Sequence, residues 1–521
     1  MIGGKLLAMA VAVVSVVLGS STGASAQDFV YRSRDTLFAG TQPFFFLGAN
    51  AYPLMVSAAR GDTQSVRDLF GMANALGITV IRTWAFYDSS DSLDPAVLQF
   101  RPGNYNEPAL RGLDYVLLQA RLHGIRLLLP LVNGWDDYGG MNQYVRWRRE
   151  VAAADNEYVP GPAERYKVPP YVRGPGGRQY RVSLGGPYEH DIFYTDSLIQ
   201  VWFTNFAAML VRRTNTLTGV RYVDDPTIAG WELANEPRSS DPTGTMVYLW
   251  VRAVAQFLRG IDLHHLLATG EEGFDVCPDP YTATGYNNQG WLFDGTAGVS
   301  FSLNSAVPEI DIAGSHLYPD YWDLPYSSGT VWIADHRRIA RNLGKPLIIG
   351  EFGARVDKSA AYDSWLNTML YDGAAGGCVW QLLVGAMSDP EDFGIRCPED
   401  ENACSVLSTN ALLFRQKCVG GLPPAPLLLR VGAPYPNPGK GLATISYSLP
   451  QDAMVFVEIY NALGQRVITV DRGMQSAGDR KEILDLRNLP SEIYFYTLRV
   501  TPLQGLDGSV GVVTGKFVVL H

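Results

Sequence analysis

Carboxylic side chains that could act as a pair stand directly after several short apolar runs of this sequence. Glu236 follows one run, Glu271 and Glu272 follow the next, and Glu351 follows a later one. Hydrolysis of a glycosidic bond needs two such groups, because the poor leaving group must be protonated from one side while a carboxylate acts from the other. Glu236 and Glu351 are one candidate pair, and Glu271 and Glu272 remain their rivals.

Other polar and aromatic residues end the apolar runs in the same way. They are Arg82, Trp84, Asn133, Trp135, Asn235, His316, Tyr318 and Trp380. Taken singly, each has an ordinary explanation as an ion-pair partner or a core residue, but together they indicate a polar cleft with aromatic walls. Arg82 and Tyr318 would hold Glu351 ionised through charge and hydrogen bonding. Burial and the neighbouring anion would raise the pKa of Glu236.

Eight apolar runs must position these side chains, and most of them are followed by a helix-like stretch. They cover residues 44–50, 78–86, 125–135, 228–237, 265–274, 310–319, 346–353 and 377–385. Continuous apolar strands are typical of a parallel sheet that is buried on both faces. Eight strand–helix repeats predict an α/β fold, the (β/α)8 TIM barrel, whose functional side chains gather at the carboxyl ends of the strands. The helix after the second run, SVRDLFGMANALG, should begin near Ser65 and end at Gly77.

The longest connection lies between the third and fourth predicted strands. It holds a segment from Tyr158 to Tyr194 that is rich in glycine, proline and tyrosine. A loop of this length within a compact domain either serves a function or argues against the assignment of the elements around it. Here it falls on the side of the barrel that builds the cleft.

The composition of the chain changes after Cys418. Residues 420–433 indicate a linker rich in proline and glycine. Beyond it, alternating apolar residues separated by turns predict a small β-sandwich over residues 434–521. The barrel would then occupy residues 27–419 as a separate catalytic domain.

The N-terminal 26 residues have the features of a signal peptide. Lys5 precedes an apolar run, and Ala24-Ser25-Ala26 offers a cleavage site; an uncleaved anchor is the alternative. The full chain is 47% hydrophobic and 18% charged, and after the N-terminal segment no apolar stretch reaches 18 residues, as expected of a folded protein without stable membrane insertion. A net charge of -10 argues against nucleic acid as a partner and suits a neutral substrate.

Five cysteines in an exported chain permit disulfides. Cys397 and Cys404 enclose a short polar loop and are the first candidate pair, whereas Cys277, Cys378 and Cys418 leave an odd thiol. No Cys-x-x-Cys motif or cluster of cysteine and histidine has the spacing of a metal site. We therefore expect neither a metal nor another cofactor.

Longer motifs resemble glycoside hydrolase family 5. WELANEP is similar to the Asn-Glu-Pro signature of that family, and IIGEFG is similar to its nucleophile signature. The resemblance is strongest to the β-mannanases of plant and fungal type, and it extends from about Phe44 to Trp380. The motifs that carry it are NGWDDYGGMNQYV, NTLTGVRYVDDPTIAGWELANEPR, TGEEGF and SHLYPDYW.

This resemblance implies a retaining endo-β-1,4-mannanase acting on mannan, glucomannan or galactomannan, with Glu236 as the acid/base and Glu351 as the nucleophile. Asn235 matches the residue that binds the sugar 2-hydroxyl, Trp380 matches a stacking platform, and Glu272 matches a carboxylate near the cleft floor that is not the nucleophile. The substrate-binding residues implied are Arg82, Trp84, Asn133, Trp135, Asn235, Glu272, His316, Tyr318 and Trp380.

The C-terminal motifs YPNPGKGLATISYSLP, EIYNALGQRV and LPSEIYFYTLRV resemble the sorting domain of the type IX secretion system. That resemblance implies the type IX secretion machinery as a partner, and a protein that is secreted, extracellular or held at the cell surface. An accessory carbohydrate-binding sandwich is the alternative for this region.

Two other functions remain open at this point. One is the same chemistry on another polymer, by a family 5 endo-β-1,4-glucanase or another β-glycanase. The other is a polysaccharide-binding surface protein without activity, built on a degenerate barrel. Proteins of the second kind typically lose one of the two carboxylates, and this chain keeps both Glu236 and Glu351.

Overall fold

The computed structural model describes most of the chain in two compact units, Met1–Leu422 and Pro423–His521. The described residues are 28–155, 171–173, 179–181, 190–279, 281–287, 289–420, 430–431, 434–449, 453–476, 478–502 and 511–520. The predicted signal peptide and most of the predicted linker lie outside these residues. Within them, no helix is both long and apolar enough to cross a membrane.

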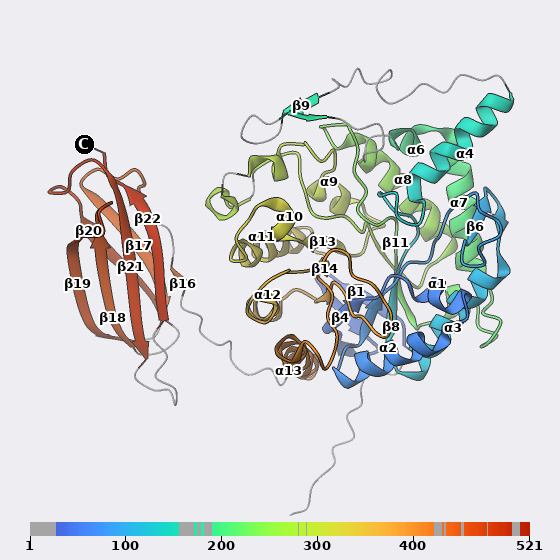
Figure 1. Ribbon diagram of the computed structural model, residues 1–521, viewed down its shortest axis with the longest axis horizontal. Coiled ribbons are helices and arrows are strands. Elements are labelled where there is room, and N and C mark those ends of the chain that lie inside the picture. The colour runs from blue at the N-terminus through green and yellow to red at the C-terminus, as the bar shows by residue number, and fades with distance from the viewer. Residues whose placement is uncertain are drawn as a thin grey trace, which may run out of the picture. The chain divides into compact units, whose positions relative to one another are not determined.

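The first unit is built on a barrel of parallel strands (Figure 1). The strands are β4 (Phe46–Asn50), β5 (Val80–Arg82), β8 (Arg126–Pro130), β11 (Ile228–Glu232), β12 (Leu266–Ala268), β13 (Ala313–Leu317), β14 (Leu347–Phe352) and β15 (Gly376–Val379). They neighbour one another in chain order, and β15 pairs with β4. A bridge between Ala268 and Ile312 links β12 to β13. Seven of the predicted runs contain one of these strands each, and the run 377–385 overlaps β15, which starts one residue earlier. The predicted (β/α)8 fold is therefore confirmed.

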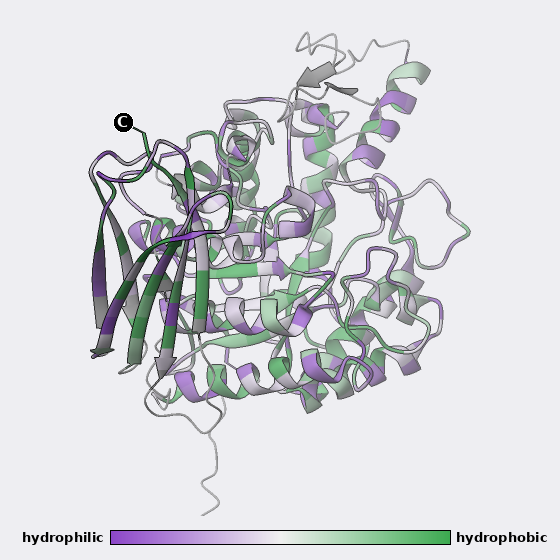
Figure 2. Ribbon diagram, turned by 60° about the vertical axis from the view of Figure 1, so that its left-hand side comes forward, coloured by the Kyte–Doolittle hydropathy of each residue, from purple (hydrophilic) through white to green (hydrophobic). Residues whose placement is uncertain are grey.

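Helices surround the barrel and bury one face against it. They are α1 (Leu54–Ala59), α2 (Thr63–Ala75), α3 (Glu107–Leu122), α4 (Gly140–Ala154), α6 (Asp191–Thr195), α7 (Ser197–Arg212), α8 (Thr245–Ile261), α9 (Phe301–Ala306), α10 (Pro319–Trp322), α11 (Ser328–Asn342), α12 (Lys358–Asp372) and α13 (Glu401–Cys418). Figure 2 shows strands that are mostly hydrophobic within helices that carry both kinds of residue. The predicted helix is α2: Asp62 caps its first turn by accepting from the Ser65 amide, and Gly77 follows its end with a φ of +79°.

A small antiparallel sheet in the first unit was not predicted. It consists of β1 (Val30–Ser33), β2 (Thr36–Ala39) and β3 (Gln42–Pro43). Its apolar side chains share a core cluster with residues at the amino ends of the barrel strands, including Val80 and Ile348. The sheet therefore covers the end of the barrel opposite the strand ends on which the site was predicted.

Short elements occupy the connections. They are the strands β6 (Gln99–Arg101), β7 (Asn104–Tyr105), β9 (Tyr171–Arg173) and β10 (Gln179–Arg181) and the 3-10 turns η2 (Tyr222–Asp224), η3 (Ala283–Tyr286) and η4 (Gly290–Phe293). Of the long segment from Tyr158 to Tyr194, the structure describes the paired strands β9 and β10 and residues 190–194. Cys397 and Cys404 form the predicted disulfide, and the other three cysteines are unpaired.

The second unit consists of two antiparallel sheets. Its strands are β16 (Arg430–Val431), β17 (Leu442–Leu449), β18 (Ala453–Tyr460), β19 (Arg466–Gln475), β20 (Gly478–Asp485), β21 (Ile493–Pro502) and β22 (Gly511–Val518). One sheet has the order β16-β17-β20 and the other β19-β18-β21-β22. Alternate residues of both sheets, such as Ile445 and Val457, join one core, as in the predicted sandwich.

Candidate active site

A cavity of about 460 Å³ opens at the carboxyl ends of the barrel strands. Nine of the predicted site residues line it: Trp84, Asn133, Trp135, Asn235, Glu236, Glu272, Tyr318, Glu351 and Trp380. The remaining two, Arg82 and His316, are buried and contact the lining residues. All eleven side chains are thus brought to one end of the barrel, as a TIM barrel does with residues that follow its strands.

The backbone around Glu236 is fixed by close contacts with two neighbouring connections. The Glu236 amide donates to the Gly270 carbonyl at 2.8 Å, and the Asn235 amide donates to the Val132 carbonyl at 2.7 Å. Glu236 has a φ of +47°, a conformation that costs energy in a residue other than glycine. A Cβ atom on Gly134 would lie 2.3 Å from the Glu236 carbonyl oxygen, so glycine is required there.

The Glu236 carboxyl group has two direct partners. The Trp135 indole donates to Oε2 at 2.6 Å, and His316 Nδ1 lies 2.6 Å from Oε1. Burial lowers the pKa of His316, which favours the neutral imidazole. Burial also raises the pKa of Glu236, against the opposing charge of Arg238, as expected of a carboxyl group that gives up and regains a proton.

Glu351 projects from β14 toward the same space because of an irregularity in the sheet. The pairing of β13 with β14 matches His316 to Glu351 and skips Gly350, which makes a bulge. A Cβ atom on Gly350 would lie 3.1 Å from His316 Nε2, so glycine lets the imidazole pack against the strand. Arg82 donates to Glu351 Oε1 at 2.5 Å, and the Tyr318 hydroxyl donates to Oε2 at 2.6 Å.

The expected contrast between the pKa values of the two glutamates is only half correct. Burial raises the pKa of Glu351 as well, although His316, Arg82 and the Tyr318 hydroxyl act in the opposite direction. Arg82 and Tyr318 act on Glu351 in the predicted direction, but burial has the larger effect, and a short sequence motif does not show how deeply a residue is buried. The two glutamates differ in their direct partners: Glu351 accepts from an arginine and a tyrosine, and Glu236 contacts an indole and an imidazole.

Arg82 connects four strands of the barrel interior. Its side chain is fully buried, and it donates from Nε to Glu232 at 2.7 Å and from Nη2 to Asn235 at 2.8 Å. A longer bond from Nη1 reaches Asn50 at 3.2 Å. Sequence reasoning missed both Glu232 and Asn50. A carboxylate inside an otherwise apolar strand was the available signal for Glu232, since such a charge needs a buried partner.

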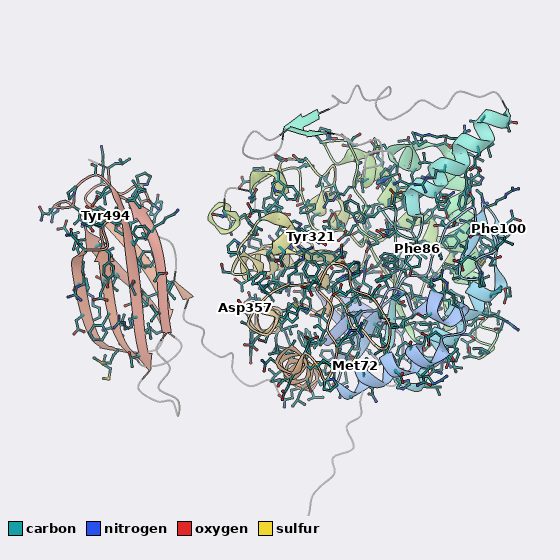
Figure 3. All side chains as sticks on the ribbon, viewed as in Figure 1. Met72, Phe86, Phe100, Tyr321, Asp357 and Tyr494 are labelled. Atoms are coloured by element: carbon teal, nitrogen blue, oxygen red, sulfur yellow. A yellow bond between two sulfur atoms is a disulfide. The ribbon has the colours of Figure 1, made fainter. Side chains whose placement is uncertain are left out.

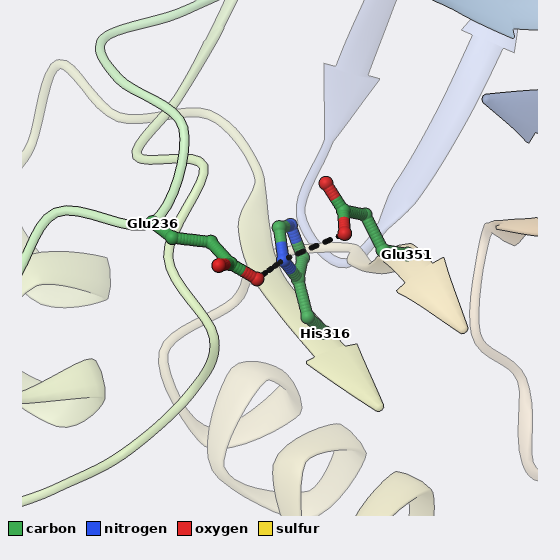
Figure 4. A group of neighbouring side chains, drawn as sticks. All are labelled: Glu236, His316 and Glu351. Carbon is green, nitrogen blue, oxygen red and sulfur yellow. Dashed lines mark hydrogen bonds and ion pairs between the residues drawn. The ribbon is translucent and has the colours of Figure 1, made fainter. Parts of the chain in front are cut away.

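Glu236 and Glu351 face each other across His316 (Figure 4). One ligand atom from each of these residues lies within 4.8 Å of the other two. His316 Nδ1 is 3.6 Å from Glu351 Oε2, so the imidazole stands near both carboxyl groups. Three such atoms could also hold a metal ion, but the carboxyl oxygens already accept hydrogen bonds from Trp135, Arg82 and Tyr318.

Aromatic side chains form one wall of the cavity. Trp380 is stacked on Tyr52 with an interplanar angle of 7° and a centroid distance of 5.6 Å, so one face of its indole is covered. Trp380 also lines the cavity. Trp84 lies at 4.9 Å from Tyr52 and 5.1 Å from Phe86, measured between ring centroids. These rings make a rigid surface against which the apolar face of a sugar can pack.

The rival glutamates have other surroundings. Glu271 is fully buried outside the cavity lining and accepts from Thr269 and Asn304. Glu272 lines the cavity and makes two hydrogen bonds of 2.6 Å with Arg238, whose guanidinium also lies over the Trp135 ring. Burial raises the pKa of Glu272 to about 7 despite this pair. Its fixed position on Arg238 suits a structural or binding role better than attack on a substrate.

Several cavity residues were not predicted individually. They are Asp137, Arg238, Trp291, Tyr321, Trp322 and Glu391. Tyr321, labelled in Figure 3, is about half exposed, donates to Glu391 and lies under the Arg355 guanidinium. Four of the six stand within or beside the quoted motifs, but Trp291 and Glu391 lie in connections whose course a sequence does not reveal.

Comparison with known protein families gives three matches. Residues 27–279 match the family described as "GH family 5 beta-mannosidase-like", and residues 214–383 match "Cellulase (glycosyl hydrolase family 5)". Residues 433–502 match the "Secretion system C-terminal sorting domain". The first two matches together include every predicted site residue.

Curated relatives are mannan endo-1,4-beta-mannosidases. Mannan endo-1,4-beta-mannosidase 1 of Oryza sativa subsp. japonica is 34% identical over 79% of this chain and 92% of its own length. Mannan endo-1,4-beta-mannosidase 7 of Arabidopsis thaliana is 35% identical over 70% and 80%. Among solved structures, the endo-1,4-beta-mannanase of Rhizomucor miehei is 30% identical, with a TM-score of 0.61 over 74% of this chain and 99% of that one. With its barrel, its paired glutamates and these relatives, the chain belongs to glycoside hydrolase family 5.

Proposed function

We propose that this glycoside hydrolase is an endo-β-1,4-mannanase that cleaves internal bonds of mannan, glucomannan or galactomannan with retention of configuration. The observation that carries the proposal is the pair Glu236 and Glu351, which project from opposite sides of the barrel mouth and bring carboxyl oxygens within 4.8 Å. Retaining enzymes hold their carboxyl groups about 5–5.5 Å apart, whereas inverting enzymes need about 6.5–9.5 Å to admit water. The names of the relatives support mannan as the polymer.

In the first half of the reaction, Glu351 attacks the anomeric carbon while Glu236 protonates the leaving oxygen. The raised pKa of Glu236 keeps a proton available, and Trp135 and His316 aim its two oxygens. Arg82 and Tyr318 each hold one oxygen of Glu351, which fixes the carboxylate for attack. The product of this step is a mannosyl ester of Glu351.

In the second half, Glu236 acts as a base and removes a proton from water. That water attacks the anomeric carbon from the side the leaving group has vacated, so the two inversions restore the original configuration. Asn235, held by Arg82 and Asn133, would bind the sugar 2-hydroxyl. Trp380 would stack on the sugar ring in the same subsite, and Trp84, Trp135 and Glu272 would contact the chain around it.

Proton NMR of the reducing ends formed from mannopentaose tests the stereochemistry. We expect the β-anomer to appear first and then to mutarotate. Initial formation of the α-anomer would refute retention. The time course of oligosaccharide lengths released from ivory-nut mannan tests the endo mode, since internal cleavage gives mixed lengths at once and exo cleavage releases a single small product.

A second candidate is an endo-β-1,4-glucanase, because residues 214–383 also match a family description headed cellulase. Release of reducing sugar from mannan and from carboxymethylcellulose separates the two activities. Activity on the cellulose derivative alone would replace the mannanase proposal. Binding to mannan without any turnover would favour the polysaccharide-binding function instead.

The second unit supports a proposal on location. Its match to a secretion-system sorting domain favours export by the type IX machinery, to the medium or to the cell surface. The predicted signal peptide at residues 1–26 and the linker at residues 420–433 fit that route. Mass spectrometry of the exported protein tests it: we expect a mature chain that starts near Gln27, and retention of an N-terminal peptide from residues 1–26 would contradict the cleavage.

A further inference from the structure

A third buried carboxylate, Glu232, lies next to the catalytic pair. It is the last residue of β11, its exposed fraction is 3%, and it accepts from Arg82 Nε at 2.7 Å. Gly270 has a positive φ, and a Cβ atom there would lie 3.2 Å from Glu232 Oε2. Gly270, in the connection after β12, therefore leaves room for the Ala234 carbonyl, 1.8 Å from such a Cβ atom, and for the Glu232 carboxylate.

Glu232 and Glu351 share one cation. Arg82 donates to Glu232 from Nε and to Glu351 from Nη1, and its side chain is completely shielded from water. A planar guanidinium has a fixed angle between these two donors, so the position of Glu232 determines where Nη1 lies. Arg82 therefore forms ion pairs with two carboxylates, Glu232 and Glu351, and not with Glu351 alone.

We infer that Glu232 is a positioning residue, which holds the guanidinium of Arg82 in place and limits how strongly that cation stabilises the anionic form of Glu351. A nucleophile that is held too firmly as an anion attacks slowly, because its stabilisation must be given up as the new bond forms. This inference rests on the proposed role of Glu351 as nucleophile.

Other groups around Glu351 contribute to its ionisation and must be considered with Glu232. His316 lies on β13, and Tyr318 directly follows that strand; both are close to the Glu351 carboxyl group. Glu236, which follows β11, faces Glu351. Cys378 on β15 lies near Arg82. Burial raises the pKa of the Cys378 thiol and of Tyr318, so both remain neutral through the working pH range. Among these groups, Glu232 is the anion bonded to the same arginine as Glu351.

Two substitutions separate the positioning effect from the charge effect. Glu232→Gln keeps the length of the side chain and an acceptor for Arg82 Nε but removes the negative charge. The pKa of Glu351 should then fall, because an anion nearby raises a carboxyl pKa and its removal lowers it. We expect the acid limb of kcat/KM to move down by about one pH unit and kcat to fall about tenfold. Glu232→Ala also frees the guanidinium, and we expect a loss in kcat of about 100-fold with little change in KM.

Asp114→Asn is the matched control. Asp114 on α3 is another fully buried carboxylate paired with an arginine, Arg213, but it lies outside the cavity lining. This variant should lose stability while its pH profile stays as in the wild type. If Glu232→Gln behaved in the same way, with lower stability and an unmoved acid limb, Glu232 would be structural only and the inference would be overturned.

The decisive measurement uses a 2-deoxy-2-fluoro-β-mannobiosyl fluoride, which traps the covalent intermediate on the nucleophile. The rate of inactivation is measured against pH, and the labelled peptide is identified by mass spectrometry. A label on Glu351, with an acid limb that shifts in Glu232→Gln, supports the inference. A label on Glu351 with identical pH dependence in both proteins refutes it, while a label on another residue in the wild type refutes the proposed mechanism instead.

Discussion

Asp114 and Glu351 are both carboxylates buried against an arginine, yet the protein surrounds them differently. Asp114 accepts two hydrogen bonds from Arg213, one from the Tyr222 hydroxyl and two from Thr216. These bonds outweigh burial and lower its pKa. Glu351 accepts one bond from an arginine and one from a tyrosine, and burial raises its pKa.

This difference distinguishes a structural carboxylate, Asp114, from the proposed nucleophile, Glu351. A carboxylate with all its acceptor sites filled is stable as an anion and fastens α3 to the loop after α7. A carboxylate with few donors retains lone pairs that can attack a substrate. A buried charge with too few hydrogen bonds lowers the stability of the protein, and such charges are common in active sites.

The strongest test of this contrast is the removal of the reactive carboxylate. Glu351→Ala should lower kcat by about 10⁴-fold or more on mannan, because no group remains to form the covalent intermediate. Added azide should restore activity and give a mannosyl azide of inverted configuration. Circular dichroism should show an unchanged fold, and full activity in this variant would contradict the assigned role.

The corresponding change at the anchor should affect stability alone. Asp114→Ala leaves Arg213 with Glu107 as its remaining acidic partner and removes the acceptor of the Tyr222 and Thr216 hydroxyls. We expect a loss of about 3 kcal/mol in the free energy of unfolding, with kcat nearly unchanged. The native pKa is lowered, so the stabilising effect is complete above the unfolded pKa and disappears as the pH falls through the native pKa. The difference between wild type and variant in thermal melts should therefore shrink on acidification.

Two tyrosines allow a finer comparison. The Tyr318 hydroxyl donates to Glu351 at 2.6 Å, and the Tyr222 hydroxyl donates to Asp114 at 2.7 Å. Tyr318→Phe should lower kcat by about 10- to 100-fold with a small change in stability. Tyr222→Phe should cost about 1–2 kcal/mol of stability and leave kcat in place. Equal effects of both substitutions on kcat would contradict the proposed difference between the surroundings of Glu351 and those of Asp114.

The smallest effect on stability is expected from neutralising Glu236, the proposed acid/base residue. Because the pKa of Glu236 is raised in the native state, the native protein holds its proton more tightly, and stability falls as the pH rises from the unfolded pKa to the native pKa. Glu236→Gln removes this loss. The variant should melt about 1–2 °C above the wild type at neutral pH while kcat falls, and the gap should close near pH 4.

The strands and the candidate catalytic pair could both be predicted from the sequence, because both leave local signals. Continuous apolar runs mark buried parallel strands, and functional side chains follow them directly, as Glu351 follows β14. The roles of Glu236 and Glu351 came from motif resemblance, which separated them from Glu271 and Glu272. Those roles are still proposals.

The features that could not be predicted depend on contacts between residues far apart in the sequence and on how deeply each residue is buried. Glu232 stands inside the motif WELANEP, but its partner Arg82 is 150 positions away. Arg238 pairs with Glu272 across two different connections. The direction of the pKa shift at Glu351 also depends on burial by the whole barrel, which no short motif contains.

The bonds of Arg82 have a consequence for when the enzyme becomes active. Its partners come from Asn50 on the first barrel strand, Glu232 and Asn235 at the fourth, and Glu351 on the seventh. A growing chain does not form the surroundings of Glu351, the proposed nucleophile, until these distant strands meet. We therefore expect hydrolytic activity only after the barrel has closed, and an incompletely folded chain should be inactive.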